Sequence, residues 1–401
     1  MKRLITSCLL FICYFVSESF AQTDSIPNVS ELELNGHVGR LVKIHGEYPE
    51  NDISSLIEFH IAQNLNGKKS WHNDFKKPSA GLSLLHAQFG NQDILGQALG
   101  IIPTMRFENW RNKTRWSWRA GLGIAGFNKP YDAVDNPRNL VIGSRFTNMT
   151  MLRIEMSKPL SKKMRYNIGL SYTHCSDAHI AVPNIGANLI SITAGISFCN
   201  QPEMLNTKKA FTKPQRAHEK WDAGAHFIFG MHEFQGTIRP VDGTMYFVYG
   251  ENLHVSKKIR PGRNFSMGLN HQYYTSYHDY ILSQELFPPG TKIRNKSHNI
   301  VAYLGYEWQY GRTALLLEAG LNLYNPFISE INKVWDLPKH GLLYVYTANK
   351  IGYRFYFTYK ENPNAVTFKP YISIAVKTNG GTADFLEFAI GTKIIRAKIR
   401  S

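Results

Sequence analysis

The chain has few cysteines and, beyond its first residues, no long apolar run. Two of its four cysteines lie before residue 22, which leaves Cys175 and Cys199, too few for a disulfide framework. After Ala21 no stretch approaches the roughly 18–20 consecutive apolar residues of a membrane-spanning helix. The sequence also contains no P-loop, no dinucleotide-binding glycine motif that opens a helix and no G-x-S-x-G motif. These absences exclude a disulfide-stapled domain, a helical membrane protein and several common enzyme classes.

The first 21 residues have the pattern of a secretory signal. Lys2 and Arg3 precede an apolar run over residues 4–16, and small residues occupy the −3 and −1 positions at Ser19 and Ala21. This order of charge, short apolar core and small residues predicts cleavage after Ala21. The mature protein is therefore expected to be exported.

Acidic residues are the scarcer charge, with 30 Asp and Glu against 46 Lys and Arg, and the net charge is +16. The basic residues are scattered through predicted turns, and an exported protein rarely meets nucleic acid. An anionic membrane surface is therefore the predicted partner, and no nucleic-acid role is expected. The sequence leaves the oligomeric state open.

Alternating apolar and polar residues dominate the chain from Glu31 onward. Such alternation in segments of about ten residues or more is typical of an antiparallel transmembrane barrel of the outer membrane. A soluble β-sandwich also alternates, but its strands usually have five or six residues. The predicted class is thus all-β, an outer-membrane β-barrel with about 12–16 strands. The candidate strands are 31–44, 54–64, 79–90, 97–107, 115–127, 144–157, 163–176, 188–199, 220–234, 244–258, 264–276, 297–309, 312–324, 343–359, 366–378 and 383–395.

The connections between these segments indicate which side of the membrane each faces. Barrels of this kind have short periplasmic turns and longer external loops. If the first strand rises from the periplasm, most connections obey this rule, although 65–78 and 200–219 are long and would be periplasmic. The predicted external loops include 128–143, 177–187, 277–296 and 325–342.

The polar segment 200–219, which contains Pro and Lys, divides the chain into halves. The predicted organisation is a signal at 1–21, a first barrel half at 22–199, a linker at 200–219 and a second half at 220–401. One continuous barrel is the favoured interpretation. An eight-stranded barrel followed by a second sheet unit is the alternative.

The hairpin predicted around residues 163–198 carries the strongest chemical signal. His174 and Ser176 continue the apolar face of their strand, and Asn188 begins the apolar face of the next strand. Polar side chains on a lipid-facing wall are costly and usually have a functional reason. A His beside a Ser is the minimum for a base-activated nucleophile, although a chance pair with a structural role remains the plainer interpretation.

At these residues the sequence resembles the outer-membrane lipid A 3-O-deacylases (PagL-like), whose longer members are often labelled acyloxyacyl hydrolases. The family pattern H-x-S-N-A corresponds to residues 174–178, and P-N-x-G-x-N corresponds to residues 183–188. The resemblance extends over roughly residues 31–199. It implies a serine esterase that removes an acyl chain from lipid A, a component of lipopolysaccharide, without a cofactor or metal.

Carried over by position, the resemblance makes Ser176 the nucleophile and His174 the general base. Asn188 falls where the short enzymes have an acidic residue that orients the His, and Asp177 falls where the family has an Asn linked to oxyanion stabilisation. An amide can hold an imidazole by a hydrogen bond but cannot offset its positive charge. Residues Asn184 and Gly186 complete the predicted oxyanion and loop region.

Other polar clusters have simpler interpretations. His226, His232 and Glu233 could form a metal site, but their spacing favours residues that line the barrel lumen. His271 and its neighbours Tyr273, Tyr274 and His278 need only lie at the membrane interface. Cys175 and Cys199 are predicted to lie about 35 Å apart, at about 3.3 Å per residue, and to form no disulfide.

Two hypotheses of different classes follow from the sequence. The first is an outer-membrane esterase whose site lies on the lipid-facing wall. The second is a barrel without hydrolytic activity that acts as a channel or a structural protein. The side to which His174 and Ser176 point separates them, because a lateral site requires both on the outer face.

Overall fold

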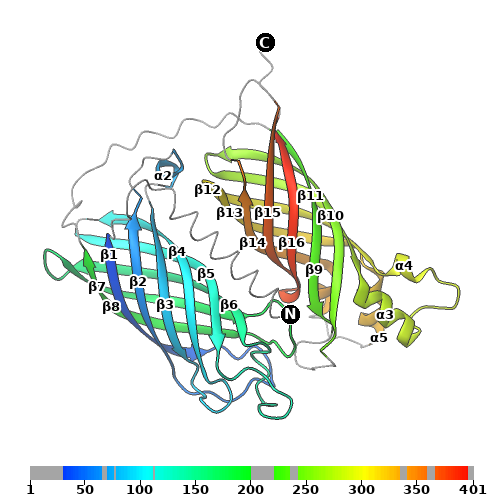
Figure 1. Ribbon diagram of the computed structural model, residues 1–401, viewed down its shortest axis with the longest axis horizontal. Helices are drawn as coiled ribbons and strands as arrows, with labels where there is room; N and C mark the ends of the chain where they lie inside the picture. The colour runs from blue at the N-terminus through cyan, green and yellow to red at the C-terminus, as the bar shows by residue number, and fades with distance from the viewer. Residues whose placement is uncertain are drawn as a thin grey trace. The chain divides into compact units, whose positions relative to one another are not determined.

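The computed structural model describes residues 30–65, 70–75, 78–111, 113–199, 221–234, 243–334, 341–358 and 366–395. The signal predicted at 1–21 and the linker predicted at 200–219 lie outside these residues. Sixteen strands are found, and each overlaps one of the sixteen segments expected from the alternation. They form two closed antiparallel barrels of eight strands each (Figure 1).

Barrel 1 is formed by the first eight strands and closes through the pairing of its first and last strands, which runs from Glu31 opposite Cys199 to Leu41 opposite Leu189. Its strands are β1 (Glu31–Leu41), β2 (Ser54–Asn64), β3 (Ser79–Gln88), β4 (Gln97–Arg111), β5 (Thr114–Phe127), β6 (Phe146–Pro159), β7 (Met164–Ser176) and β8 (Ala187–Cys199). A short helix, α2 (Ser70–Asp74), lies in the connection between β2 and β3.

Barrel 2 closes in the same way through the pairing of β9 with β16, which runs from Met231 opposite Leu386 to Asp222 opposite Ile395. Its strands are β9 (Trp221–Glu233), β10 (Met245–Arg260), β11 (Arg263–Tyr274), β12 (His298–Tyr310), β13 (Thr313–Tyr324), β14 (Thr347–Tyr356), β15 (Thr367–Asn379) and β16 (Thr382–Ile395). Its helices are α3 (Thr275–Gln284), α4 (Ile293–Lys296), α5 (Pro326–Val334) and α6 (Gly341–Tyr346).

The single continuous barrel favoured from the sequence is therefore wrong. Alternation identifies strands and their faces, but it does not encode which strand pairs with which distant one. Here β8 pairs with β1 and β9 pairs with β16, so each half closes its own hydrogen-bonding edges. The two barrels are described separately below.

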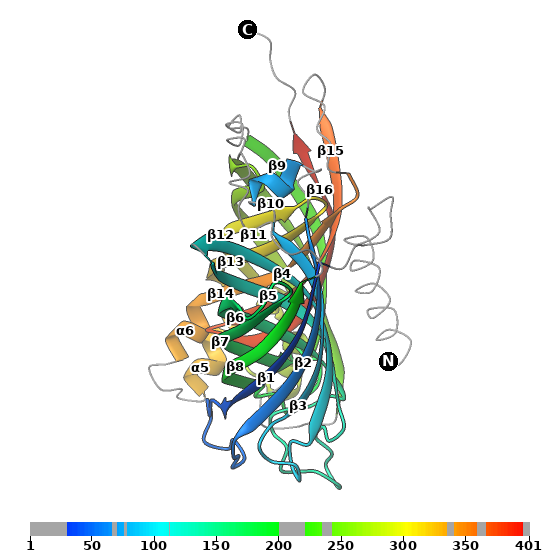
Figure 2. The same ribbon diagram turned by 90° about the vertical axis from the view of Figure 1, so that its left-hand side faces the viewer.

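Each barrel carries its apolar side chains on the outer wall, as the fold class requires. Leu99, Ile154 and Leu170 of barrel 1 are 69%, 64% and 62% exposed, whereas polar residues at alternate positions are buried inside. In barrel 2 Phe227 and Leu253 are likewise exposed. Figure 2 shows the tilt of the strands along the walls. Apolar residues outside and polar residues inside are the reverse of a soluble protein and the arrangement of a transmembrane barrel, which confirms the predicted fold class.

The lumen of barrel 1 has a charged layer and an apolar layer. The charged layer lies toward the end at which β1 begins, and there Glu58 contacts Arg119 at 3.0 Å, Arg153 at 2.8 Å and His37 at 3.2 Å. The apolar layer lies toward the end at which β7 leaves the barrel and includes Leu41, Leu56, Phe89, Phe127, Met149 and Cys175, all buried. Side chains therefore fill this lumen, as expected for eight strands.

The end of barrel 2 that carries its helices is closed by aromatic residues from these helices and from the strands. Tyr274 stacks on Tyr277 with ring centroids 4.1 Å apart, and Tyr277 stacks on Phe327 at 4.0 Å. These rings share an apolar cluster with lumen residues Ile228 and Val248. Among the described residues, no helix is both long enough and apolar enough to cross a membrane.

Candidate active site on the outer wall of barrel 1

The antiparallel pairing of β7 with β8 sets the backbone of the site. His174 lies directly opposite Asn188, close to the point where the hairpin leaves the barrel. Along β7, Thr173 and Cys175 are buried inside the barrel, while Tyr172 and His174 alternate with them on the outer side. The structure therefore places His174 and Asn188 on the outer wall, as the lateral-site hypothesis requires.

Asn188 joins His174 to a residue that the sequence did not single out. The Asn188 amide oxygen accepts a hydrogen bond from Nδ1 of His174 at 2.8 Å and one from the hydroxyl of Tyr172 at 2.6 Å. An amide oxygen only accepts, so Nδ1 of His174 carries the proton and Nε2 keeps its lone pair. Tyr172 is two residues before His174 on the same face, and this spacing is the signal that could have revealed it.

Ser176 is buried at the end of β7, with 7% of its surface exposed. Asn184 donates a hydrogen bond from Nδ2 to the Ser176 hydroxyl at 3.1 Å. Asn148 of β6, which the sequence analysis missed, donates to the Ser176 carbonyl at 2.6 Å. Two amides thus fix the hydroxyl and the backbone of Ser176.

Gly186 lets the loop between β7 and β8 approach both side chains. A Cβ atom at this position would lie 3.2 Å from Cε1 of His174 and 3.6 Å from Cβ of Ser176, and its φ of +81° favours glycine. His174 and Ser176 therefore border the same point. The Gly186 N–H donates to the carbonyl of Val141 at 2.9 Å, which ties this loop to the one between β5 and β6.

Asp177 directly follows Ser176 and is 5% exposed. The next two residues, Ala178 and His179, have φ values of 60° and 69°, in the left-handed region that non-glycine residues seldom adopt. Strained turns of this kind cluster at functional sites. The structure thus brings the six predicted site residues together around one tight turn, while their catalytic roles stay predictions.

The other histidines considered from the sequence are bonded inside barrel 2. Nδ1 of His226 lies 2.9 Å from the Tyr371 hydroxyl, and Nε2 of His232 lies 3.1 Å from the Ser276 hydroxyl. Within the described ranges, no group of three or more His, Cys, Asp or Glu side chains is placed to hold a metal ion. Cys175 and Cys199 are both free thiols.

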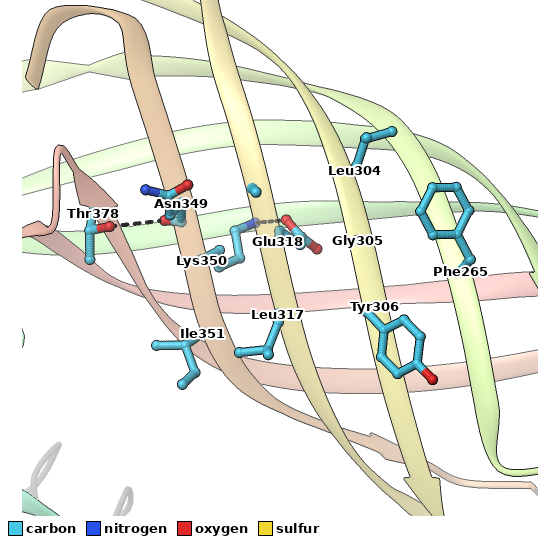
Figure 3. A pocket seen from close by; sticks show the side chains of 11 residues that line it. Phe265, Leu304, Gly305, Tyr306, Leu317, Glu318, Asn349, Lys350, Ile351 and Thr378 are labelled. Atoms are coloured by element: carbon cyan, nitrogen blue, oxygen red, sulfur yellow. Dashed lines mark hydrogen bonds and ion pairs between the residues drawn. The ribbon is translucent and has the colours of Figure 1, made fainter. Parts of the chain in front are cut away.

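A cavity of about 460 Å³ lies on barrel 2, away from these residues (Figure 3). It crosses β11 to β15, and its lining includes the exposed side chains of Leu304, Leu317 and Ile351. Its lining also includes Glu318 and Lys350, whose charged atoms are 3.5 Å apart. Most of this lining is apolar and lies on the lipid-facing wall.

Residues 57–197 match the family model described as lipid A 3-O-deacylase (PagL). Most of barrel 1 is similar to this family. The match covers less than half of the chain and includes His174, Ser176 and Asn188, so it confirms the resemblance seen in the sequence. Together with the apolar outer walls, it identifies the chain as an outer-membrane protein.

Solved structures of outer-membrane barrels are also similar to the chain. The crystal structure of the outer membrane enzyme PagL matches 41% of this chain and 97% of its own, with 14% identity and a TM-score of 0.31. A triple mutant of the Rhodopseudomonas blastica porin matches 91% and 99%, with 11% identity and a TM-score of 0.18. The search of curated proteins found no match.

Proposed function

We propose that the PagL-like barrel is a lipid A deacylase that works as a serine esterase. One observation carries this proposal: His174 and Asn188 are hydrogen-bonded on the lipid-facing wall, with Ser176 two residues after His174 on the same strand, within the part of the chain that matches the family. An ester of an outer-leaflet lipid reaches such a site laterally, with its acyl chain along the apolar wall.

The reaction begins when Oγ of Ser176 attacks the ester carbonyl and Nε2 of His174 takes the hydroxyl proton. The tetrahedral intermediate collapses, the bond to the sugar oxygen breaks, and His174 returns its proton to that oxygen. Water then attacks the acyl-serine with His174 again as base, which releases the fatty acid and restores Ser176. Atoms and protons balance, and the cycle needs no cofactor.

The charge that develops on the carbonyl oxygen needs a donor close to Ser176. Nδ2 of Asn184 lies 3.1 Å from the Ser176 hydroxyl and is the donor we assign to this role. The Gly186 N–H is bonded to Val141, so we assign Gly186 to loop closure instead. Asp177 brings a carboxylate next to this region, which opposes a negative oxyanion and lowers the expected rate.

Tyr172 helps the Asn188 amide to serve as the partner of His174, because an amide has only one oxygen that can accept the imidazole proton. A carboxylate accepts hydrogen bonds with either oxygen, whereas an amide works only when its oxygen faces the imidazole. The Tyr172 hydroxyl donates to that oxygen and so favours the working orientation. We assign Tyr172 as a positioning residue that keeps His174 in the tautomer with a free Nε2.

The test is release of fatty acid from lipid A by the purified protein, followed by mass spectrometry. Release is expected from the wild type and from Ser197→Ala, a control serine buried inside barrel 1, but not from Ser176→Ala or His174→Ala. Equal release from the wild type and Ser176→Ala would mean that another group, or a contaminant, does the chemistry. No release from the folded wild type would support the inactive barrel instead.

The alternative of a channel has little support from barrel 1. Its lumen is filled by the charged layer around Glu58 and by the apolar layer above it, so no continuous water path passes through it. An inactive structural barrel with a remnant site remains the competing function that the release assay decides.

A further inference from the structure

A line of three ionisable side chains crosses the outer wall of barrel 2. The Glu251 carboxylate accepts a hydrogen bond from Nδ1 of His271 at 2.7 Å, and these residues are directly opposite on β10 and β11. Nε2 of His271 lies 2.8 Å from Nδ1 of His298 on β12, with the two rings 12° from parallel. On the same wall their neighbours Leu253 and Leu269 are exposed apolar residues.

Ionisable groups on a lipid-facing wall are rare and generally mark a functional site. Glu251 and His271 are not covered by the protein, since 54% and 40% of their side-chain surfaces are exposed. An interfacial role alone, which is what the sequence indicated for His271, explains one polar residue near the membrane surface. It does not explain a continuous hydrogen-bonded line across three strands.

The order of the hydrogen bonds gives the line a direction. Glu251 fixes the proton of His271 on Nδ1, and Nε2 of His271 then faces Nδ1 of His298. A phosphate at the end of the line would favour one added proton shared by the imidazoles, and the charge of that proton also offsets that of Glu251. In this form both rings are donors, and the outer nitrogen of His298 presents an N–H at the end of the line.

Positive charge is gathered next to that end. Arg294 of α4 is exposed and lies close enough to His298 and Tyr273 to interact with both electrostatically. Within the part of the chain that the structure describes, Arg294 has no ion pair. Lys292, just before α4, is also exposed. The helices α3 and α4 connect β11 and β12 at one end of barrel 2 (Figure 1).

We propose that His298 and Arg294 bind the phosphate of an outer-leaflet lipid headgroup, and that Glu251 and His271 position and charge His298. The occupant follows from the place and the charge of the site. The wall faces lipid, the end carries the loop 277–296 that its length predicts to be external, and N–H donors beside a guanidinium complement a phosphate. This inference concerns barrel 2 alone and does not depend on hydrolysis by barrel 1.

The experiment measures lipid retained by the full chain after incubation with phosphatidylcholine vesicles that contain either phosphorylated or dephosphorylated lipid A. All proteins carry Ser176→Ala, so that barrel 1 does not consume the lipid, and retained lipid is counted by native mass spectrometry. Adding His298→Ala and Arg294→Ala is expected to reduce retention of the phosphorylated form about tenfold, because charge-assisted hydrogen bonds are lost. Adding Lys333→Ala, which removes an exposed cation paired with Glu330 on α5, is expected to change nothing.

A second variant keeps the test informative if the double replacement fails to fold. Glu251→Gln leaves the wall packed but cannot hold the added proton, and it should also lower retention of the phosphorylated form. Unchanged retention in the folded variants would overturn the proposal, as would an equal loss for the dephosphorylated lipid. Displacement of the lipid by inorganic phosphate at the same concentration would show that a free anion, not a lipid headgroup, is the occupant.

Discussion

Replacing Asn188 by Asp tests how His174, the proposed general base, is held. The structure already places the acceptor 2.8 Å from Nδ1 of His174, so the change adds a negative charge without altering the tautomer. A charged partner makes a hydrogen bond worth about 1.5–3 kcal/mol, against about 0.5–1.5 for a neutral one. The difference of about 1–1.5 kcal/mol, applied to the imidazolium in the transition state, predicts a turnover about 5- to 10-fold higher in Asn188→Asp.

Tyr172→Phe should have the opposite effect, and its size should depend on residue 188. With Asn188 in place, loss of the hydroxyl removes a hydrogen bond of about 0.5–1.5 kcal/mol from the working amide orientation, which predicts turnover about 2- to 10-fold lower. With Asp at this position either oxygen serves, so Tyr172→Phe should change turnover less than about 2-fold. Substrate affinity should be similar in all four proteins.

The assay is the rate of fatty-acid release at saturating lipid A, measured for the wild type, both single variants and the double variant. Tyr166→Phe is the matched control, since Tyr166 lies on the same face of β7 farther from the site. Heat-modifiable mobility on gels checks that each barrel is folded. Equal effects of Tyr172→Phe in both backgrounds would refute the orientation argument, and lower turnover in Asn188→Asp would refute the electrostatic one.

Three further predictions concern the rest of the molecule. Asp177→Asn should raise turnover, by up to about 100-fold if the new amide joins Asn184 as an oxyanion donor, whereas an unchanged rate would show that Asp177 points away from the reacting carbonyl. Glu58→Ala should lower the free energy of unfolding by about 3–5 kcal/mol in denaturant titrations, because Arg119, Arg153 and His37 each lose one buried partner; a change under about 1 kcal/mol would contradict this network. In planar bilayers the protein should show no steady conductance through barrel 1, and stable open channels that persist when barrel 2 is deleted would disprove the filled lumen.

Much of the fold could be predicted because a period of two residues is a strong signal in this chain. All sixteen strands and the outer position of His174 follow from the alternation of faces. The closure into two barrels could not be predicted, because the pairing of β8 with β1 joins residues far apart in sequence and no local sequence pattern indicates it. The break at the polar segment 200–219 hinted at it.

The site divides in a similar way. His174, Ser176 and Asn188 could be found from their common face and from the family pattern. Asn148 could not, because its bond to the Ser176 carbonyl depends on the register between β6 and β7. Tyr172 lies on the same face as His174, but the sequence alone does not distinguish it from a tyrosine at the membrane interface. The line from Glu251 to His298 joins three strands, so only their lateral pairing reveals it.

The outward position of His174 and Asn188 determines which variable controls the reaction. A site on the lipid wall meets its substrate by diffusion in two dimensions, and the fatty acid that it releases stays in the same leaflet. The rate should therefore follow the mole fraction of lipid A in the membrane or micelle and not its concentration in the tube. Adding inert detergent at constant total lipid A should therefore slow the release of fatty acid, because the detergent lowers the mole fraction of lipid A in the micelle.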